Sequence, residues 1–307
     1  MSAMQRNTLT AFDIALYGAV VFAWGFSWIA LHYQVGVVAP EISVMWRFAL
    51  AAPVMLACAF LRGERLFFPP GDHARFAALG LMIFSTNFVL FYYGGQHLAS
   101  GLLAVVFSLA SIVNVWLGWL VLRAPIDTRV VTGGLLGVLG VASMFYPQLV
   151  GTTFSHDVLL GFVFCVFGTL LFCSGNMVSA LLQRRNIPVF AASGYGMLYG
   201  AAGLAVYAAL RGLPFAIDPT VKYVGGLVWL ALVSSVLAFG SYLTLLGRIG
   251  ADRAGYSTVM FPVVALAVST FAEGYHWTLP AIAGLIAVMG GNLLVLRRSR
   301  NADHSAA

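Results

Sequence analysis

Long apolar blocks, separated by short polar or charged segments, make up most of this 307-residue chain. The clearest block runs from 76 to 122, which is 47 consecutive positions without a charged side chain. A hydrocarbon core about 30 Å thick is crossed by roughly 20 helical residues, so this block is long enough for two crossings. We expect the chain to turn within the segment 97–101 (HLASG), with one membrane helix on either side of it.

Charged residues and Pro/Gly breaks divide the rest of the chain in the same way. Composition agrees, because 61% of the residues are hydrophobic and only 8% are charged, against about 25% charged in soluble domains. We therefore predict an all-α integral membrane fold that has the lipid bilayer as its partner. The ten predicted transmembrane helices are 12–33, 41–61, 76–96, 100–122, 129–147, 157–182, 188–210, 223–247, 254–272 and 277–297.

Basic residues are distributed unevenly between the two sides of these spans. One side has only Arg211 and Lys222, and Arg47 falls within a span. By the positive-inside rule, the richer side is cytoplasmic and holds both termini. The net charge of +6 follows from this asymmetry, so we expect no nucleic-acid partner. The thirteen basic residues on the richer side are Arg6, Arg62, Arg65, Arg75, Arg123, Arg129, Arg184, Arg185, Arg248, Arg253, Arg297, Arg298 and Arg300.

The two halves of the chain resemble each other at an offset near 150. Gly134 and Gly140 of the segment TGGLLGVLGV align with Gly284 and Gly290 of the segment IAGLIAVMGG. Five helices is an odd number, so the second copy enters the membrane inverted. Inverted repeats are typical of secondary transporters, whose substrate site lies between the halves near the midplane. The predicted repeats are 12–147 and 157–297.

Several sequence features of these spans resemble those of the EamA-type branch of the drug/metabolite transporter superfamily. They are Trp24-Gly25 with Ser27 in the first span, Arg47-Phe48 in the second, and Glu273 at the end of the ninth. The resemblance implies an inner-membrane carrier that works by alternating access, with spans one to four of each half lining the path. It also implies a small-molecule substrate. Because the similar family members export aromatic amino acids, the resemblance implies outward transport of aromatic and other neutral amino acids.

The chain departs from the family pattern in its fourth span. The ninth span has Pro262 and Glu273, whereas the fourth has Ser111 or Ile112 and Arg123 at the corresponding places. Strict symmetry between the halves is therefore not expected. Within transport, the alternative is proton-coupled efflux of another metabolite or a drug.

Ionisable side chains other than Arg47 avoid the centres of the predicted spans. All ten acids and all six histidines fall at or near span ends, in loops or in the C-terminal tail, without a known hydrolase or zinc motif. The three cysteines lie in apolar blocks and are read as small hydrophobes. We expect no catalytic residue, metal or cofactor, and we keep a lipid-modifying enzyme only as a remote alternative.

The same scarcity of charge within the spans bears on ion coupling. Proton- or sodium-driven carriers generally keep a carboxylate within the membrane, where charge is costly. Its absence here favours facilitated diffusion or exchange, with Glu41 and Glu273 as the exceptions to test. The chain is expected to act as a monomer or a weak homo-oligomer.

Neutral polar and aromatic side chains occupy the predicted midplane instead. Amides can bond an amino group or a carboxylate, and aromatic faces attract an ammonium with about 0.5–2 kcal/mol. The alternative for an Asn is a bond to a neighbouring helix, worth about 0.6 kcal/mol. The predicted substrate-binding residues are Trp24, Ser27, Trp28, Asn87, Tyr92, Ser111, Cys173, Asn176, Tyr199, Phe239 and Tyr242.

Arg47 is the one charged residue predicted inside a span. It lies six residues into its helix, which is about 9 Å along the axis. Two roles are open for it at this stage. It is either a structural anchor, which snorkels outward or pairs with Glu41 or Glu273, or a ligand for the carboxylate of a substrate.

Overall fold

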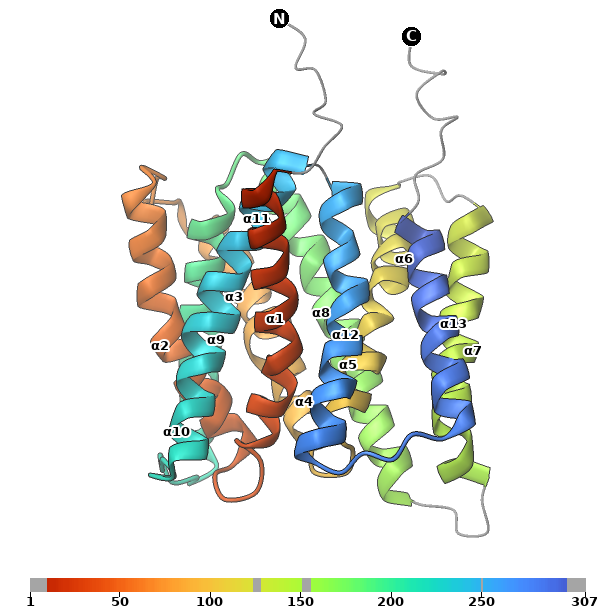
Figure 1. The fold of residues 1–307 in the computed structure, drawn as a ribbon. Coiled ribbons are helices and arrows are strands. Elements are labelled where there is room, and N and C mark those ends of the chain that lie inside the picture. Colours follow the sequence, from red (N-terminus) through yellow and green to blue (C-terminus); the bar gives the residue numbers. More distant parts are fainter. Residues whose placement is uncertain (1–9, 124–127, 151–155, 250, 297–307) are drawn as a thin grey trace, which may run out of the picture.

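The structure, a computed structural model, describes residues 10–123, 128–150, 156–249 and 251–296. Within these ranges every regular element is a helix (Figure 1). The helices cross the molecule ten times, in alternating directions. The start of α1 and the end of α13 lie at the same end of the bundle. We call this the terminal end and the opposite one the distal end.

Seven crossings are single helices, and three are interrupted. The single ones are α1 (Ala11–His32), α2 (Pro40–Leu61), α7 (Thr128–Val150), α8 (His156–Arg184), α9 (Val189–Leu210), α12 (Ala251–Ala272) and α13 (Leu279–Leu296). The third crossing consists of α3 (Pro70–Leu81), the π-helical segment η1 (Met82–Thr86) and α4 (Asn87–Gly94). The fourth consists of α5 (Ser100–Ser108) and α6 (Ala110–Leu122), and the eighth of α10 (Val221–Val228), η2 (Trp229–Leu237) and α11 (Ala238–Ile249).

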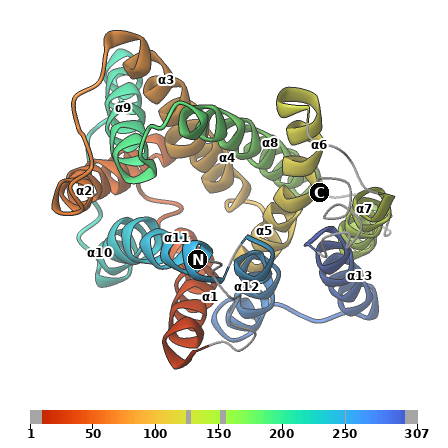
Figure 2. The same ribbon diagram turned by 90° about the horizontal axis from the view of Figure 1, so that it is seen from above.

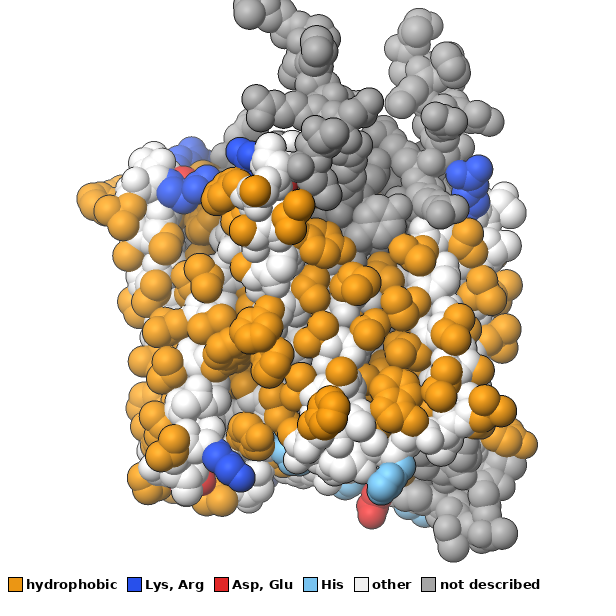
Figure 3. Space-filling model, viewed as in Figure 1, with side chains coloured by type: hydrophobic (Ala, Val, Ile, Leu, Met, Phe, Trp, Pro, Cys, Tyr) orange, Lys and Arg blue, Asp and Glu red, His pale blue; other side chains and the backbone are white. Residues whose placement is uncertain are grey.

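The predicted all-α fold with ten crossings is confirmed. Seven segments are long and apolar enough to span a bilayer, and the remaining crossings contain the shorter apolar helices Val131–Tyr146, Val259–Ala272 and Leu279–Leu294. Figure 3 shows an apolar band around the middle of the molecule, with Lys and Arg side chains near its edges. Such a surface would be insoluble in water and is suited to lipid. The chain is a multi-pass membrane protein.

The third crossing begins at Pro70 and not at 76, where the charge pattern predicted it. Arg75 was taken as the start of the apolar span, but the helix continues through it. Its Nη1 donates to Asp72 Oδ1 at 2.8 Å in the first turn. A charged residue limits the part of a helix that lies in hydrocarbon, and it does not stop the helix itself.

The packing of the helices combines both halves of the chain. α1 packs mainly on α11 and α12, whereas α8 packs mainly on the third and fourth crossings. Two further pairs, α2 with α9 and α7 with α13, lie at opposite edges of the bundle in the view from above (Figure 2). All of these contacts therefore join an element of the first half to an element of the second half.

Glycines let the α7/α13 pair approach closely. A Cβ atom added at Gly140 would lie 2.6 Å from the Gly284 carbonyl oxygen, closer than real Cβ contacts allow. Both positions are among the glycines aligned between the halves. Backbone-to-backbone contact of this kind is a common way to join membrane helices.

Candidate functional site

Trp24 lies where the first and eighth crossings meet. Its ring is 5.4 Å from that of Tyr242 and 6.4 Å from that of Phe261, measured between centroids. Its Nε1 donates to the Ser234 carbonyl oxygen at 3.3 Å. The π-helical segment η2 therefore presents a carbonyl group to the first crossing, and Trp24 and Tyr242, both predicted site residues, are brought together.

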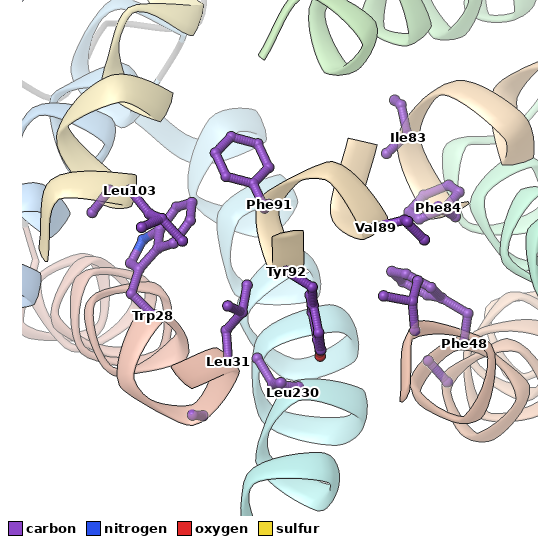
Figure 4. Packing of buried hydrophobic residues seen from close by; sticks show 14 of the residues in the cluster. Trp28, Leu31, Phe48, Ile83, Phe84, Val89, Phe91, Tyr92, Leu103 and Leu230 are labelled. Carbon is purple, nitrogen blue, oxygen red and sulfur yellow. The ribbon is translucent and has the colours of Figure 1, made fainter. Parts of the chain in front are cut away.

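Trp28, one helical turn nearer the distal end, is the centre of an aromatic cluster. Its ring lies 5.3 Å from Phe91 and 5.6 Å from Phe107, and it stacks on Phe261 at 6.4 Å. Figure 4 shows Trp28 beside Leu103 of α5, with Phe91 reaching toward them from α4. The cluster joins α1, α4, α5 and α12. The three phenylalanines were missed, because in sequence they resemble the many Phe residues that face lipid.

Glu273 holds the same helices together at the distal end. Both of its carboxylate oxygens accept from the Ser100 backbone N–H at 3.1 Å, and the Ser100 hydroxyl donates to it as well. His32 Nδ1 lies 3.1 Å from Oε1. The carboxylate thus caps the start of α5, which favours an anion, and it connects α12 to α1 and α5.

Tyr223 makes a second distal contact between the halves. Its hydroxyl lies 2.9 Å from Ser43 Oγ of α2, and its carbonyl oxygen accepts from Gln34 Nε2 at 2.5 Å. At this end α5 reaches both α1 and α12, whereas at the terminal end α6 packs chiefly on α8. The distal end is therefore the more tightly closed end of the bundle.

Arg47 is buried, with 4% of its surface exposed. Its Nε and Nη2 donate to Ser235 Oγ at 3.2 and 3.1 Å, and its guanidinium carbon lies 4.1 Å from the centroid of the Phe88 ring. The expected pairing with Glu41 or Glu273 is wrong. Glu41 accepts from the Tyr93 hydroxyl at 2.8 Å, and Glu273 is engaged at the start of α5. Arg47 connects α2 to η2 without a carboxylate.

Asn87 and Tyr92 are fully buried residues of α4 whose side-chain polar groups are incompletely satisfied. Both are 0% exposed. The Asn87 amide makes no hydrogen bond within the described residues. The Tyr92 hydroxyl interacts with the Arg47 guanidinium, which has only donors, so its own hydrogen has no acceptor there. A buried polar atom left unpaired is costly and calls for an explanation.

The other predicted residues are occupied by contacts within the protein. Ser27 donates to the Ala23 carbonyl of its own helix at 2.5 Å, and Phe239 packs partly buried against the apolar core. Four bond across helix contacts: Ser111 with Asn292, Cys173 with the Ala110 carbonyl (3.5 Å), Asn176 with Asn114 (3.1 Å) and Tyr199 with His73 (2.9 Å). These bonds are explained by helix packing alone, and a substrate role for the four stays a prediction.

The described residues contain no group of three or more His, Cys, Asp or Glu side chains that could hold a metal ion. The site is therefore built from aromatic rings, neutral polar groups and one cation, contributed by the first, second, third, fourth, eighth and ninth crossings.

Comparison with known proteins identifies relatives that match this chain along most of its length. The chain is 22% identical to Protein PagO of Salmonella typhimurium, over 93% of this chain and 96% of that one. It is 26% identical to an uncharacterized transporter of Archaeoglobus fulgidus, over 90% and 95% of the two chains. A solved crystal structure with 15% sequence identity superimposes with a TM-score of 0.66, covering 92% of this chain and 95% of the other, and so has the same fold.

A family model matches the chain twice, over residues 13–146 and 151–297. Together these matches cover nearly the whole sequence, and the family consists of transporters and not of enzymes. The protein belongs to the EamA-like transporter family.

Proposed function

We propose that this transporter exports neutral amino acids, aromatic ones included, across the inner membrane by alternating access, as facilitated diffusion or exchange. The observation that supports this best is the chemistry of the helix centres. Trp24 contacts the segment η2 at the Ser234 carbonyl, and the cation of Arg47 contacts the same segment at Ser235. Such a lining suits a small solute that carries both an apolar ring and a carboxylate.

The position of the buried carboxylates supports transport without tight ion coupling. Each one lies at the end of a crossing and is already bonded there. They are Asp13 with Thr10 and Arg248, Glu41 with Tyr93, Asp72 with Arg75, and Glu273 with Ser100 and His32.

Two inverted five-helix repeats, 12–147 and 157–297, are part of the proposal. The two matches to the family model fall close to these ranges. The π-helical segments η1 and η2 also occupy the third crossing of each half. With the basic terminal end in the cytoplasm, the closed distal end makes this an inward-facing arrangement.

Solute counterflow into proteoliposomes tests the proposal. Liposomes preloaded with unlabelled phenylalanine are expected to take up labelled phenylalanine and leucine without a pH gradient. Failure of every amino acid to exchange would remove the substrate class.

A second candidate, proton-coupled efflux, rests on Glu273, which is a buried carboxylate at the distal closure. If an imposed pH gradient drives accumulation above the equilibrium level, and Glu273→Gln abolishes that accumulation while exchange persists, coupling replaces the uncoupled mechanism.

A further inference from the structure

Arg47 carries a charge at a depth where charge is expensive. It lies one helical turn inward from Ser43, whose hydroxyl contacts Tyr223 at the distal closure. The guanidinium is therefore just inside the closed end and not at the surface of the bilayer. Within the described part of the chain, none of the six ion pairs includes Arg47. A buried cation without a counter-ion is unstable unless other groups or a ligand offset the cost of desolvation.

The contacts of Arg47 leave part of its hydrogen-bonding capacity free. A guanidinium has five N–H donors arranged as a planar fork. The bonds from Nε and Nη2 both go to one neutral acceptor, Ser235 Oγ. One face of the group lies over the Phe88 ring, which attracts a cation but accepts no conventional hydrogen bond.

A second unpaired donor lies beside it. The Tyr92 hydroxyl interacts with the Arg47 guanidinium. A guanidinium has donors and no acceptor, so the hydrogen of the buried hydroxyl finds no acceptor within the described residues. Figure 4 shows Tyr92 pointing to the opposite side of α4 from Phe91, toward η2 and Leu230. A cation and a hydroxyl donor, both incompletely satisfied, thus come together between α2, α4 and η2.

We propose that Arg47 and Tyr92 bind the carboxylate of the transported solute. A carboxylate accepts two parallel bonds from the guanidinium fork, and a hydroxyl donates a third. Its negative charge would also offset the buried positive charge. This deepens the proposed function and rests on it for the amino-acid part, because the site itself requires only a small organic acid with an apolar group.

A purely structural role is the competing explanation. In that case Arg47 serves only to hold Ser235 and so fastens α2 to η2. The two roles differ in a measurable way, since a structural anchor has no preference between an acid and the corresponding amide.

The experiment compares matched ligands on the purified full-length chain. Ligand-induced thermal stabilisation is titrated with tryptophan against tryptophanamide, and with indole-3-propionate against indole-3-propionamide. The acid of each pair is expected to bind at least about tenfold more tightly than its amide, as charge-assisted bidentate bonds would give. Arg47→Gln is expected to abolish this preference, Arg47→Lys to keep part of it, and Tyr92→Phe to reduce it about threefold without changing amide binding.

Arg62→Gln is the matched control, because it also removes one guanidinium that lies over an aromatic ring, that of Phe190. It should leave the preference unchanged. If Arg47→Gln does not fold, Arg47→Lys and Tyr92→Phe decide the question, and an unchanged preference in both overturns the proposal.

The failures of the two proposals are distinguishable. If indole-3-propionate binds over its amide while neither tryptophan nor any other amino acid binds or exchanges, the carboxylate site stands and the amino-acid function fails. If amino acids exchange but acid and amide bind equally, the site at Arg47 and Tyr92 fails alone. If no acid binds, both are overturned.

Discussion

At the residue scale, the side chain of Asn87 is the clearest anomaly in the core. Its amide nitrogen and oxygen are both buried and unpaired within the described residues. The backbone around it packs against α8, because a Cβ at Gly168 would lie 3.1 Å from the Asn87 carbonyl oxygen. An unpaired amide at this depth either forms hydrogen bonds when the substrate is bound, or it lowers the stability of this conformation relative to another one.

Asn87→Leu is expected to raise the free energy of unfolding, because it removes an unsatisfied buried amide that costs about 1–3 kcal/mol. Thermal unfolding in detergent measures the change. Asn176→Leu is the control, because Asn176 Nδ2 donates to Asn114 Oδ1 at 3.1 Å. That variant leaves Asn114 without its partner and should lower stability. A lower unfolding temperature in Asn87→Leu would mean that the amide is bonded in the folded protein.

These two asparagines show how far the sequence could predict the site. Both were identified from their residue type and their depth in a span. Their partners depend on how each helix is rotated about its axis, and one sequence contains little information on that rotation. For the same reason the charge on Arg47 was noticed, whereas its contacts with Ser235 and Phe88 were not.

At the element scale, the third crossing of each half contains a π-helical segment closed by a serine. Ser85 Oγ donates to the carbonyl oxygens of Gly80 and Leu81, at 3.1 and 3.0 Å. Ser235, 150 positions later, donates to the Leu230 carbonyl oxygen at 2.8 Å. A π-helical turn leaves backbone carbonyls without their usual partners, and in lipid they must be satisfied internally.

Ser85→Ala is expected to lower the free energy of unfolding by about 0.5–1.5 kcal/mol, since it leaves a buried carbonyl without its extra donor. Chemical or thermal unfolding in detergent measures this. Ser174→Ala is the control, because that exposed hydroxyl donates to the Leu170 carbonyl in an ordinary helix and should matter little. Equal effects of the two changes would contradict a special role for the hydroxyl of Ser85.

Helix ends were better predicted than helix interruptions. The turn between α4 and α5 falls at 95–99, next to the segment that the apolar pattern indicated. The break between α5 and α6 at Leu109 has no proline to mark it, whereas α12 remains one helix although it contains Pro262. Interruptions are set by packing against neighbouring helices, so the local sequence alone does not locate them.

At the scale of the whole molecule, the ends of the bundle differ in charge. In the described residues, Arg211 follows α9 and Lys222 begins α10, both at the distal end, and the other basic residues outside α2 lie at or near helix ends on the terminal side (Figure 1). The sequence could predict this asymmetry because it depends only on loop composition. It could not predict that α1 and α8 would each pack mainly on crossings of the other half.

The proposed orientation, with both termini in the cytoplasm, can be tested directly. In a background in which Cys58, Cys165 and Cys173 are replaced, Lys222→Cys should react with a membrane-impermeant thiol reagent added to intact spheroplasts. Arg184→Cys should react only after the membrane is permeabilised. The reverse pattern would place the termini outside.

The distal closure depends on Glu273, whose carboxylate connects α12 to α5 and α1. Glu273→Gln weakens these bonds, because hydrogen bonds to a charged acceptor contribute about 1.5–3 kcal/mol and those to a neutral one about 0.5–1.5. A difference of about 1 kcal/mol would raise the population open at this end roughly fivefold. Ser27→Cys, at the residue before Trp28 in α1, is the reporter in the cysteine-replaced background, and its labelling from the distal side should become about fivefold faster.

The matched control for that change is Glu64→Gln at the opposite end of the molecule. Glu64 Oε2 accepts from the Ala191 backbone N–H at the start of α9, at 3.1 Å, as Glu273 does at the start of α5. Glu64→Gln loses a helix cap of the same kind but leaves the distal contacts intact. The cysteine at position 27 should therefore be labelled in this variant at the same rate as in the parent protein. If Glu273→Gln also labels at the parent rate, other contacts, such as that between Tyr223 and Ser43, keep the distal end closed.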